Sequence, residues 1–371
     1  MNNIDFKKLG DYVKIKTGKL DANASSEDGE YPFFTCSIEP LKISSYSYDC
    51  ECCLVAGNGD LNVKYYNGKF DAYQRTYIIE SLDKEKLDVM YLYFFLSSYI
   101  EVLRKQSIGG VIKYIKLGNL TDALIPIPEL SKQKEICQNL IKAKKILSSN
   151  ENLLSKYDTL IKSRFIEMFG DNPVENGKWK VEKLGNLVTV TSSKRIYAEE
   201  QSTEGIPFLR ISDLVSKING IDSNDLYIPE EKYHEFVENG LVPNVDDILV
   251  TSRGTLGLCY TITADDKFYF QDGMITWLKF SNHESILSIF LSFLFNVILK
   301  QKIDLKTNGA TVKYVSISEL KNLEIPVPPL ELQQQFAAFV QQIDKSKFEI
   351  ENTRILDYNI SHQLSCLSNR R

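Results

Sequence analysis

Short polar loops that combine a basic side chain with glycine, serine or threonine recur along this chain of 371 residues. In the first half they are residues 64–69 and 74–76, and in the second half residues 192–195, 251–255 and 306–311. Hydroxyl, amide and guanidinium groups beside glycine can approach phosphates, and arginine or glutamine can read base edges in the major groove. Any one of these loops, taken alone, is most simply an ordinary surface turn. Their recurrence in both halves favours a nucleic-acid interface, with the candidate DNA-binding residues Lys64, Arg75, Lys113, Lys194, Arg195, Arg253, Thr255, Asn308 and Lys313.

Motifs that would indicate catalysis on DNA are missing from the sequence. An adenine methyltransferase needs a glycine-rich cofactor loop and an Asn- or Asp-Pro-Pro-aromatic motif that grips a flipped base. Residues 172–174 (Asn-Pro-Val) lack the second proline and the aromatic residue, and there is no Gly-x-x-x-x-Gly-Lys-Ser/Thr phosphate loop. The acidic pairs 246–247 and 265–266 could serve a metal-dependent nuclease, but adjacent carboxylates in turn-like segments are usually solvated surface. We therefore expect a non-catalytic chain without a cofactor.

The cysteines give no indication of a metal site. Cys50, Cys52 and Cys53 lie close together, but no second cysteine pair follows at zinc spacing and the chain has only 3 histidines. Buried or strand-surface thiols are the favoured interpretation. Seven cysteines without a framework spacing fit a reducing compartment.

Composition is that of a soluble globular protein, with 43% hydrophobic and 25% charged residues. The first eight residues have no apolar signal core, and the longest apolar stretch, residues 286–299, is too short and too polar to span a bilayer. We expect a cytoplasmic protein with no membrane contact. The net charge of −5 argues mildly against nucleic acid, although acidic surface elsewhere can hide a local basic face.

An internal duplication organises these loops. Residues 109–115 (Gly-Gly-Val-Ile-Lys-Tyr-Ile) recur as residues 309–315 (Gly-Ala-Thr-Val-Lys-Tyr-Val), 200 positions later. An Ile-Pro-x-Pro segment and a glutamine follow in both copies at the same offset, ending in Gln133 and Gln333. Glycine supplies a tight turn, and proline holds the residue before it in an extended conformation, so each copy predicts a turn, an extended strap and a helix start.

Further matches extend the duplication upstream. Residues 8–10 (Lys-Leu-Gly) recur 175 positions later, and Leu54-Val55 and Gly59 recur 195 positions later. The growing offset indicates insertions in the second copy, and the segments between these anchors differ widely. Two modules with one framework and different loops are typical of one task performed on different targets.

A long helix is expected behind each strap. The first has apolar residues in steps of three and four without proline or glycine before Gly170, and at about 1.5 Å per residue it would span roughly 55–60 Å. Its predicted seam is Ile136, Leu140, Ala143, Leu147, Leu154, Tyr157, Ile161 and Met168, interrupted by Asn150 and Arg164. The second keeps the same spacing at Phe339, Ile343, Ile350, Ile360, Leu364 and Leu367. An antiparallel pairing of these helices would place the two globular units at opposite ends.

We therefore predict an α+β protein with two similar mixed domains, residues 1–128 and 171–328. They are separated by two long helices, residues 129–170 and 329–371, packed as an antiparallel coiled coil.

This order of elements resembles the specificity subunit of Type I restriction–modification systems. Residues 125–133 and 325–333 carry the resemblance, and residues 165–171, Trp179 and residues 183–185 look like that family's junction between the first helix and the second domain. One departure from the family's pattern is Glu129, where the second copy has Pro329, and another is the polar tail 368–371, which could shorten the last helix.

The resemblance implies two target-recognition domains, each of which binds one half of a split double-stranded DNA sequence. The helices would separate them and dock modification (methyltransferase) subunits, two in number, and restriction (ATP-dependent endonuclease) subunits would join. Catalysis, S-adenosylmethionine and ATP would belong to those partners. Two alternatives are a coiled-coil adaptor whose globular ends bind proteins or glycans, which the acidic charge and the 20 Tyr and 19 Phe would suit, and a self-sufficient DNA methyltransferase, which the missing motifs contradict.

Overall fold

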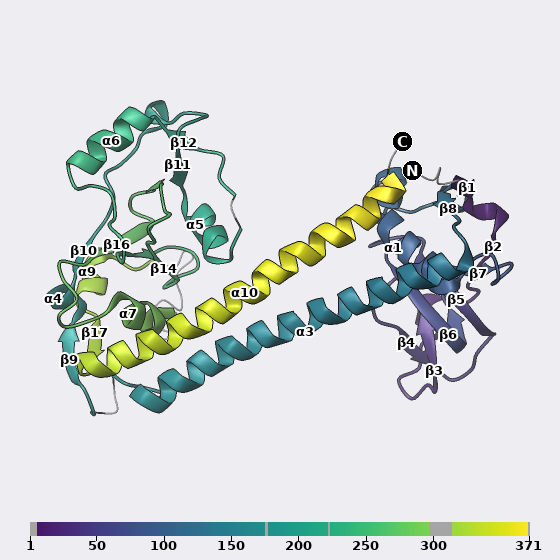
Figure 1. Ribbon diagram of the computed structural model, residues 1–371, viewed down its shortest axis with the longest axis horizontal. Helices are drawn as coiled ribbons and strands as arrows, with labels where there is room; N and C mark the ends of the chain where they lie inside the picture. Colours follow the sequence, from purple (N-terminus) through teal and green to yellow (C-terminus); the bar gives the residue numbers. More distant parts are fainter. Residues whose placement is uncertain (1–5, 175–176, 222, 297–313, 370–371) are drawn as a thin grey trace. The chain divides into compact units, whose positions relative to one another are not determined.

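The computed structural model describes residues 6–174, 177–221, 223–296 and 314–369, with side chains up to residue 351. The chain divides into two compact units (Figure 1). Unit 1 comprises residues 1–152 and 350–371, and unit 2 comprises residues 153–349. Each unit contains part of both long helices, which are α3 (Leu130–Phe169) and α10 (Leu330–Asn369).

Unit 1 is built on a six-stranded sheet. Its strands are β2 (Val13–Thr17), β3 (Tyr31–Phe34), β4 (Leu41–Ile43), β5 (Tyr48–Ala56), β6 (Val63–Ala72) and β7 (Thr76–Ser81). They lie in the order β2-β7-β5-β6-β3-β4, and the one parallel pair among them is β3 with β6. Residues 52–56 of β5 form a continuous apolar run and are all buried, as is typical of a central strand with both faces covered.

Helix α1 (Val89–Gln106) covers this sheet, and its N-terminus is capped because the Asp88 side chain accepts a hydrogen bond from the Tyr91 amide. Leu92, Leu96 and Leu103 of α1 share the core with Val55 of β5. The remaining elements are β1 (Phe6–Lys8), the 3-10 helices η1 (Leu9–Asp11) and η2 (Ala22–Ala24), α2 (Leu117–Thr121) and β8 (Leu124–Pro126). Strands β1 and β8 pair antiparallel beside the start of α3.

Unit 2 repeats this plan with shorter strands. The elements are β9 (Lys180–Lys183), α4 (Leu184–Leu187), β10 (Thr189–Thr191), η3 (Ala198–Glu200), β11 (Ile206–Leu209), α5 (Ile211–Ile218), β12 (Tyr227–Ile228), α6 (Glu230–Glu238), β13 (Ile248–Thr251), β14 (Cys259–Thr261), β15 (Tyr269–Phe270), β16 (Ile275–Lys279), α7 (Ser288–Leu294), α9 (Ile317–Lys321) and β17 (Glu324–Val327). The sheets run β10-β16-β13-β14, β12-β11-β15 and β17-β9. Elements α5, β12 and α6 lie between β11 and β13, where the sequence offset grows from 175 to 195, so they account for the insertion.

The duplication extends to individual backbone hydrogen bonds. The Leu9 amide donates to the Ala123 carbonyl at 2.8 Å in unit 1, and the Leu184 amide donates to the Leu323 carbonyl at 2.8 Å in unit 2. In both units this bond joins the start of the domain to the strand that precedes the long helix. The predicted fold class, two similar mixed domains with two long helices, is confirmed.

The long helices have 40 residues each, which corresponds to about 60 Å at 1.5 Å per residue. Within unit 2 they pack antiparallel. Phe165 of α3 contacts Phe336 of α10, with ring centroids 5.4 Å apart. Asp158, two turns earlier in α3, forms an ion pair (2.6 Å) with Lys347, which lies three turns later in α10. Phe165 and Phe169 are fully buried in this core, whereas the predicted seam, which Arg164 interrupts, omitted both phenylalanines. Arg164 is half-buried and lies over the Phe339 ring of α10, 5.9 Å from its centre, while the Phe165 face of α3 packs on α7 and α10.

A buried glutamine joins each long helix to its own globular domain. In unit 1 the Gln133 Oε1 accepts from the Asp88 amide (2.9 Å), and its Nε2 donates to the carbonyls of Lys86 and Pro128 (2.8 Å each). In unit 2 the Gln333 Oε1 accepts from the Leu287 amide (2.9 Å). Its Nε2 donates to the carbonyls of Ser285 (3.0 Å) and Pro328 (2.8 Å). Both glutamines are 0% exposed, so each satisfies three polar contacts that would otherwise lack partners.

Candidate nucleic-acid interface

The turn after the central strand has the same backbone contacts in both units. We call these contacts the frame: residues 57–59 against residues 113–115 in unit 1, and residues 252–254 against residues 314–315 in unit 2. In unit 1 the Ile115 amide donates to the Gly57 carbonyl (2.9 Å), and Asn58 forms an antiparallel bridge with Tyr114. The next residue, Gly59, has φ +70°, a left-handed conformation that favours glycine. The carbonyl of Lys113 accepts a hydrogen bond from the Gly59 amide at 2.9 Å.

In unit 2 the Val315 amide donates to the Ser252 carbonyl (3.0 Å), and Arg253 forms an antiparallel bridge with Tyr314. Gly254 follows with φ +72°. The residues that lie just before α2 and α9, Tyr114-Ile115 and Tyr314-Val315, are therefore held against the turn of the central strand in each unit. Asn58 and Arg253 occupy the same place in the two frames.

A polar hollow opens beside this frame in unit 1. It has a volume of about 300 Å³ and is lined by Thr17, Gly57, Gln74, Arg75, Tyr77 and Ile115. The Tyr77 hydroxyl donates to the Ile115 carbonyl at 3.1 Å, which connects β7 to the loop ahead of the strap. Arg75 is exposed at this hollow, and its carbonyl accepts from the Gly57 amide at 2.8 Å. The backbone of Arg75 is thus fixed while its guanidinium faces solvent.

The corresponding hollow in unit 2 has a volume of about 390 Å³ and brings together two of the predicted site residues, Arg195 and Arg253. The remaining lining residues are Ile196, Gln201, Phe208, Gln271, Asp272, Gly273 and Met274. The Arg195 Nε donates to Asp272 at 2.8 Å, and this hydrogen bond raises the pKa of Arg195 above its ordinary value. Arg195 therefore has a fixed direction, as a side chain must have to recognise a partner of defined shape.

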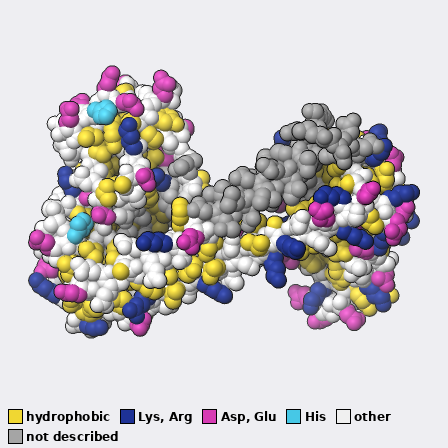
Figure 2. Space-filling view, in the orientation of Figure 1, with side chains coloured by type: hydrophobic (Ala, Val, Ile, Leu, Met, Phe, Trp, Pro, Cys, Tyr) yellow, Lys and Arg dark blue, Asp and Glu magenta, His cyan; other side chains and the backbone are white. Residues whose placement is uncertain are grey.

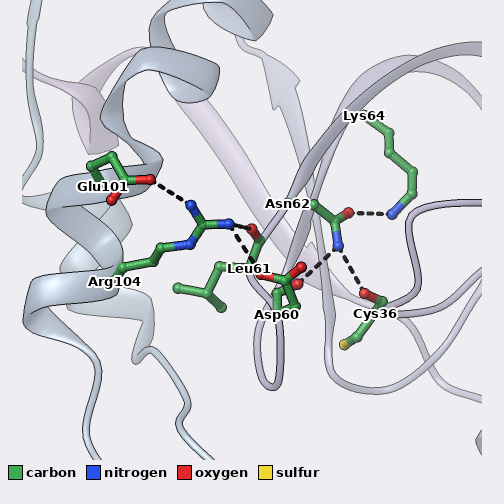
Figure 3. Close-up of polar contacts among 7 residues, drawn as sticks. All are labelled: Cys36, Asp60, Leu61, Asn62, Lys64, Glu101 and Arg104. Atoms are coloured by element: carbon green, nitrogen blue, oxygen red, sulfur yellow. Dashed lines mark hydrogen bonds and ion pairs between the residues drawn. The ribbon is translucent and has the colours of Figure 1, made fainter. Parts of the chain in front are cut away.

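The turn of unit 1 is braced from behind (Figure 3). Arg104 of α1 donates to the Asp60 carboxylate (3.0 Å) and to the Leu61 carbonyl (3.1 Å). The Asn62 amide donates to the carbonyls of Cys36 (2.8 Å) and Asp60 (3.0 Å). These bonds hold residues 60–62 against α1 and the loop after β3, so this part of the turn has a defined conformation.

The other predicted site residues have different surroundings. Lys64 is half-buried on β6 and donates to the Asn62 side chain, and burial lowers the pKa of its ammonium. Lys113 is exposed. The ammonium of Lys194 lies 5.3 Å from the centre of the Phe236 ring, and Thr255 is exposed at the tip of the turn after β13. Asn308 and Lys313 lie outside the described residues.

Sequence reasoning missed two features of this interface. One is Asn58, although it precedes Gly59 as Arg253 precedes Gly254, so the 195-residue offset could have identified it. The other is the tip of the loop ahead of the strap, where Val111 and Ile112 are 104% and 62% exposed. Gly109 permits this tip, because its φ is +119° and an added Cβ would lie 2.5 Å from the Ile112 carbonyl oxygen. Exposed apolar side chains beside a lysine are used by DNA-binding proteins as wedges between bases.

Charge is mixed on the face of the molecule that Figure 2 shows. On the face shown in Figure 2, lysine and arginine side chains are interspersed with aspartate and glutamate over each unit. In the parts of the chain that the structure describes, no three His, Cys, Asp or Glu side chains gather to form a possible metal site. None of the helices in those parts is long and apolar enough to cross a membrane.

The chain contains a duplicated domain, and each copy is joined to a long helix. The two copies share one frame but expose different polar side chains, so the protein presents two related recognition surfaces. Comparison with known proteins agrees. The family model of the Type I restriction modification DNA specificity domain matches residues 1–156 and 176–357, so the chain belongs to that family. It is a specificity subunit of a Type I restriction–modification system, a class of protein that recognises DNA.

Relatives and solved structures support this membership. The EcoDI specificity subunit of Escherichia coli is 42% identical over 139 residues, which cover 37% of this chain and 31% of that protein. A putative Type I specificity subunit of Haemophilus influenzae is 25% identical over 92% of this chain and 88% of its own length. Among solved structures, the S subunit of a Type I system from M. genitalium has the same fold, with a TM-score of 0.65 and 20% identity over 98% of this chain and 96% of that one.

Proposed function

We propose that each unit binds one half of a bipartite double-stranded DNA target through the frame at the end of its central strand. The observation that carries this proposal is that the two frames share their backbone hydrogen bonds but present different side chains. A common backbone fixes where each surface meets DNA, and the side chains then select the bases. The domain limits that accompany this proposal are residues 1–128 and 171–328.

Arginines at the two hollows are the strongest candidates for contact with bases. Arg75, Arg195 and Arg253 all line these hollows, and arginine is suited to bidentate recognition of guanine and of phosphate. Lys64, Lys113, Lys194, Thr255, Asn308 and Lys313 complete the proposed interface as contacts to the DNA backbone. Contacts of that kind set register without selecting sequence.

The long helices are the proposed spacer and docking surface. Ile146, Leu153 and Leu160 of α3 are exposed and recur every seven residues, so they share one face of the helix. An exposed apolar stripe of this kind suits the helices of a partner protein. We propose that two modification subunits bind there and that restriction subunits join them. The methyltransferase and ATP-dependent endonuclease chemistry would then belong to these partners, in the cytoplasm, and this chain would carry no catalytic step or cofactor.

A domain exchange tests the proposal. Residues 174–324 are replaced by the corresponding segment of a related specificity subunit, and the chain is produced together with the modification subunits of its own system. Methylation-sensitive sequencing of the host genome should then show a change in one half of the target, with the other half unaltered. A change in both halves would contradict independent recognition by the two units.

The adaptor hypothesis predicts a different result. A coiled-coil adaptor with protein or glycan ligands would show no salt-dependent affinity for DNA, whereas phosphate contacts make DNA affinity fall steeply as salt rises. Titrating a DNA duplex that contains the methylated sequence into the assembled complex at 50 and 200 mM salt separates the two functions. Purified alone, the chain should transfer no methyl group to DNA.

A further inference from the structure

We propose that Asn58 and Arg253 are the same reading position in the two units, and that this position selects adenine in the half-site of unit 1 and guanine in the half-site of unit 2. The inference rests on the proposed function, because it requires that the two frames face DNA. It adds which side chain discriminates between bases and which base each unit prefers.

The backbone places the two side chains equivalently. Asn58 lies two residues beyond Ala56, whose partner on β7 is Thr76, and Arg253 lies two residues beyond Thr251, whose partner on β16 is Ile275. Each is held by a bridge to a tyrosine, and each is followed by a glycine in the left-handed conformation. Side chains on two such frames leave the backbone in the same direction relative to their own domain.

Asn58 is oriented while its donor group stays available. The Cys36 thiol donates to the Asn58 Oδ1 at 2.9 Å, which fixes the plane of the amide and leaves the second lone pair of that oxygen. Its Nδ2 donates to no group among the residues that the structure describes. The side chain is half-buried in a turn that Arg104 braces, so little conformational entropy remains to be lost on binding.

Arg253 differs from its neighbour Arg195 in the same hollow. Arg195 is paired with Asp272, whereas the described contact of the Arg253 guanidinium is a weak one, with the Met274 sulfur at 3.8 Å. Arg253 is also exposed. Most of the Arg253 donors therefore remain available for a ligand, whereas the Nε of Arg195 is already bonded to Asp272.

The chemistry of the two side chains assigns the bases. An amide can accept from N6 of adenine while it donates to N7, and a guanidinium can donate to both O6 and N7 of guanine. The Asn58 amide retains one acceptor and two donors, and Arg253 offers only donors. A good bidentate pair gives about 5- to 150-fold discrimination against the wrong base.

Reciprocal substitutions test the assignment in the complex of the full chain with the modification subunits of its system. The readout is the methylated sequence, obtained by sequencing the host genome, together with the affinity of the complex for duplexes that differ at single positions. Asn58→Arg should change one position of one half-site from adenine to guanine. Arg253→Asn should make the opposite change at one position of the other half-site.

Two further variants keep the test decisive. Arg253→Ala removes an exposed side chain with no ion pair in the described structure, so folding is preserved, and it should lower discrimination at one position by about 5- to 150-fold. Glu85→Arg places the same new side chain at an exposed position between β7 and α1, outside the proposed interface, and should leave the sequence preference unchanged. Thermal unfolding of each complex verifies that the variants are folded.

The outcomes separate the inference from the proposed function. If Arg253→Ala and Asn58→Arg both leave the methylated sequence and the single-position preferences as they were, the assignment is wrong, although the two-domain function stands. If Arg253→Ala weakens binding equally for every sequence, Arg253 holds a phosphate and the assignment is also overturned. If the unmodified complex shows no sequence preference at all, the proposed function itself fails.

Discussion

Replacing Gln333 with leucine should loosen the joint between α10 and the domain of unit 2. The substitution keeps an apolar side chain of similar size at a fully buried position but removes three hydrogen bonds. The Leu287 amide loses its acceptor, and the carbonyls of Ser285 and Pro328 lose their donor. Leaving a buried polar group without a partner costs about 1–3 kcal/mol.

The expected loss is smaller than the sum over three groups. Ser285 is exposed and Leu287 is half-buried, so water can replace part of what the side chain supplied, whereas Pro328 is buried. We expect Gln333→Leu to lower the free energy of unfolding by about 2–4 kcal/mol. For a unit of about 200 residues this corresponds to a lowering of the melting temperature by roughly 4–16 °C.

Two comparisons isolate the hydrogen bonds from packing. Gln334→Leu is the matched control, because Gln334 is the neighbouring residue in the same helix and is exposed, and its loss should stay within about 0.5 kcal/mol. Gln333→Glu keeps the shape but places an acceptor-only carboxylate against two carbonyl oxygens, so it should also destabilise unit 2 at pH 7. Differential scanning calorimetry of the full chain measures all three. If the melting temperatures of Gln333→Leu and Gln334→Leu differ by less than about 2 °C, the hydrogen bonds of Gln333 do not stabilise unit 2 and the reasoning is refuted.

Three other predictions concern different parts of the chain. Insertion of four residues after Ser148 lengthens α3 by about 6 Å, or one to two base pairs of DNA at about 34 Å per turn, so the spacer between half-sites should grow in genome-wide methylation maps. An active variant with the original spacer would show that α3 does not set the spacing. Replacing both Val111 and Ile112 with serine should leave unfolding unchanged, because both are exposed, but lower the affinity for DNA; unchanged affinity in fluorescence anisotropy would exclude this tip from the interface. The pKa of Glu51 is lowered mainly by its hydrogen bond with Lys84, so this pair stabilises the fold above the ordinary glutamate pKa and the contribution disappears as the pH falls through the lowered value. When the pH is lowered from 7 to 3, the free energy of unfolding measured in urea should therefore fall less for Lys84→Met than for the unmodified chain. Equal decreases would show that the Glu51–Lys84 pair does not stabilise the fold.

The repeats in the sequence predicted the fold because the repeated residues form the same strand pairs and hydrogen bonds in both units. The Ile-Pro-x-Pro straps form β8 and β17, where each pairs with the first strand of its domain, and the repeated Leu9 and Leu184 anchor the opposite end. Proline and glycine restrict the backbone locally, so their spacing alone conveys the local conformation. The task of the repeated Gln133 and Gln333 was not evident, because a glutamine in the first turn of a helix is usually exposed.

The missed residues depend on contacts that no local pattern encodes. The heptad spacing left Phe165 and Phe169 out of the seam. They are buried because of what packs on α3, since Phe290 of α7 contacts both of them. The same holds for the candidate site. Arg195 and Arg253 are distant in sequence, and only the pairing of β10, β13 and β16 brings their loops to one hollow.

The two units differ where a change of target would be needed and agree where a change would be harmful. The glutamine joint and the strap pairing are repeated with nearly the same distances, and both lie beside the long helices on which the partners are proposed to bind. The insertion of α5, β12 and α6 in unit 2 follows directly after β11, beside Phe208 of the hollow. On the proposed function, a rigid joint would let such insertions and the Asn58-to-Arg253 difference alter the recognised bases without moving the helix. This separation of frame and reading side chain would allow one duplicated domain to serve two unrelated half-sites.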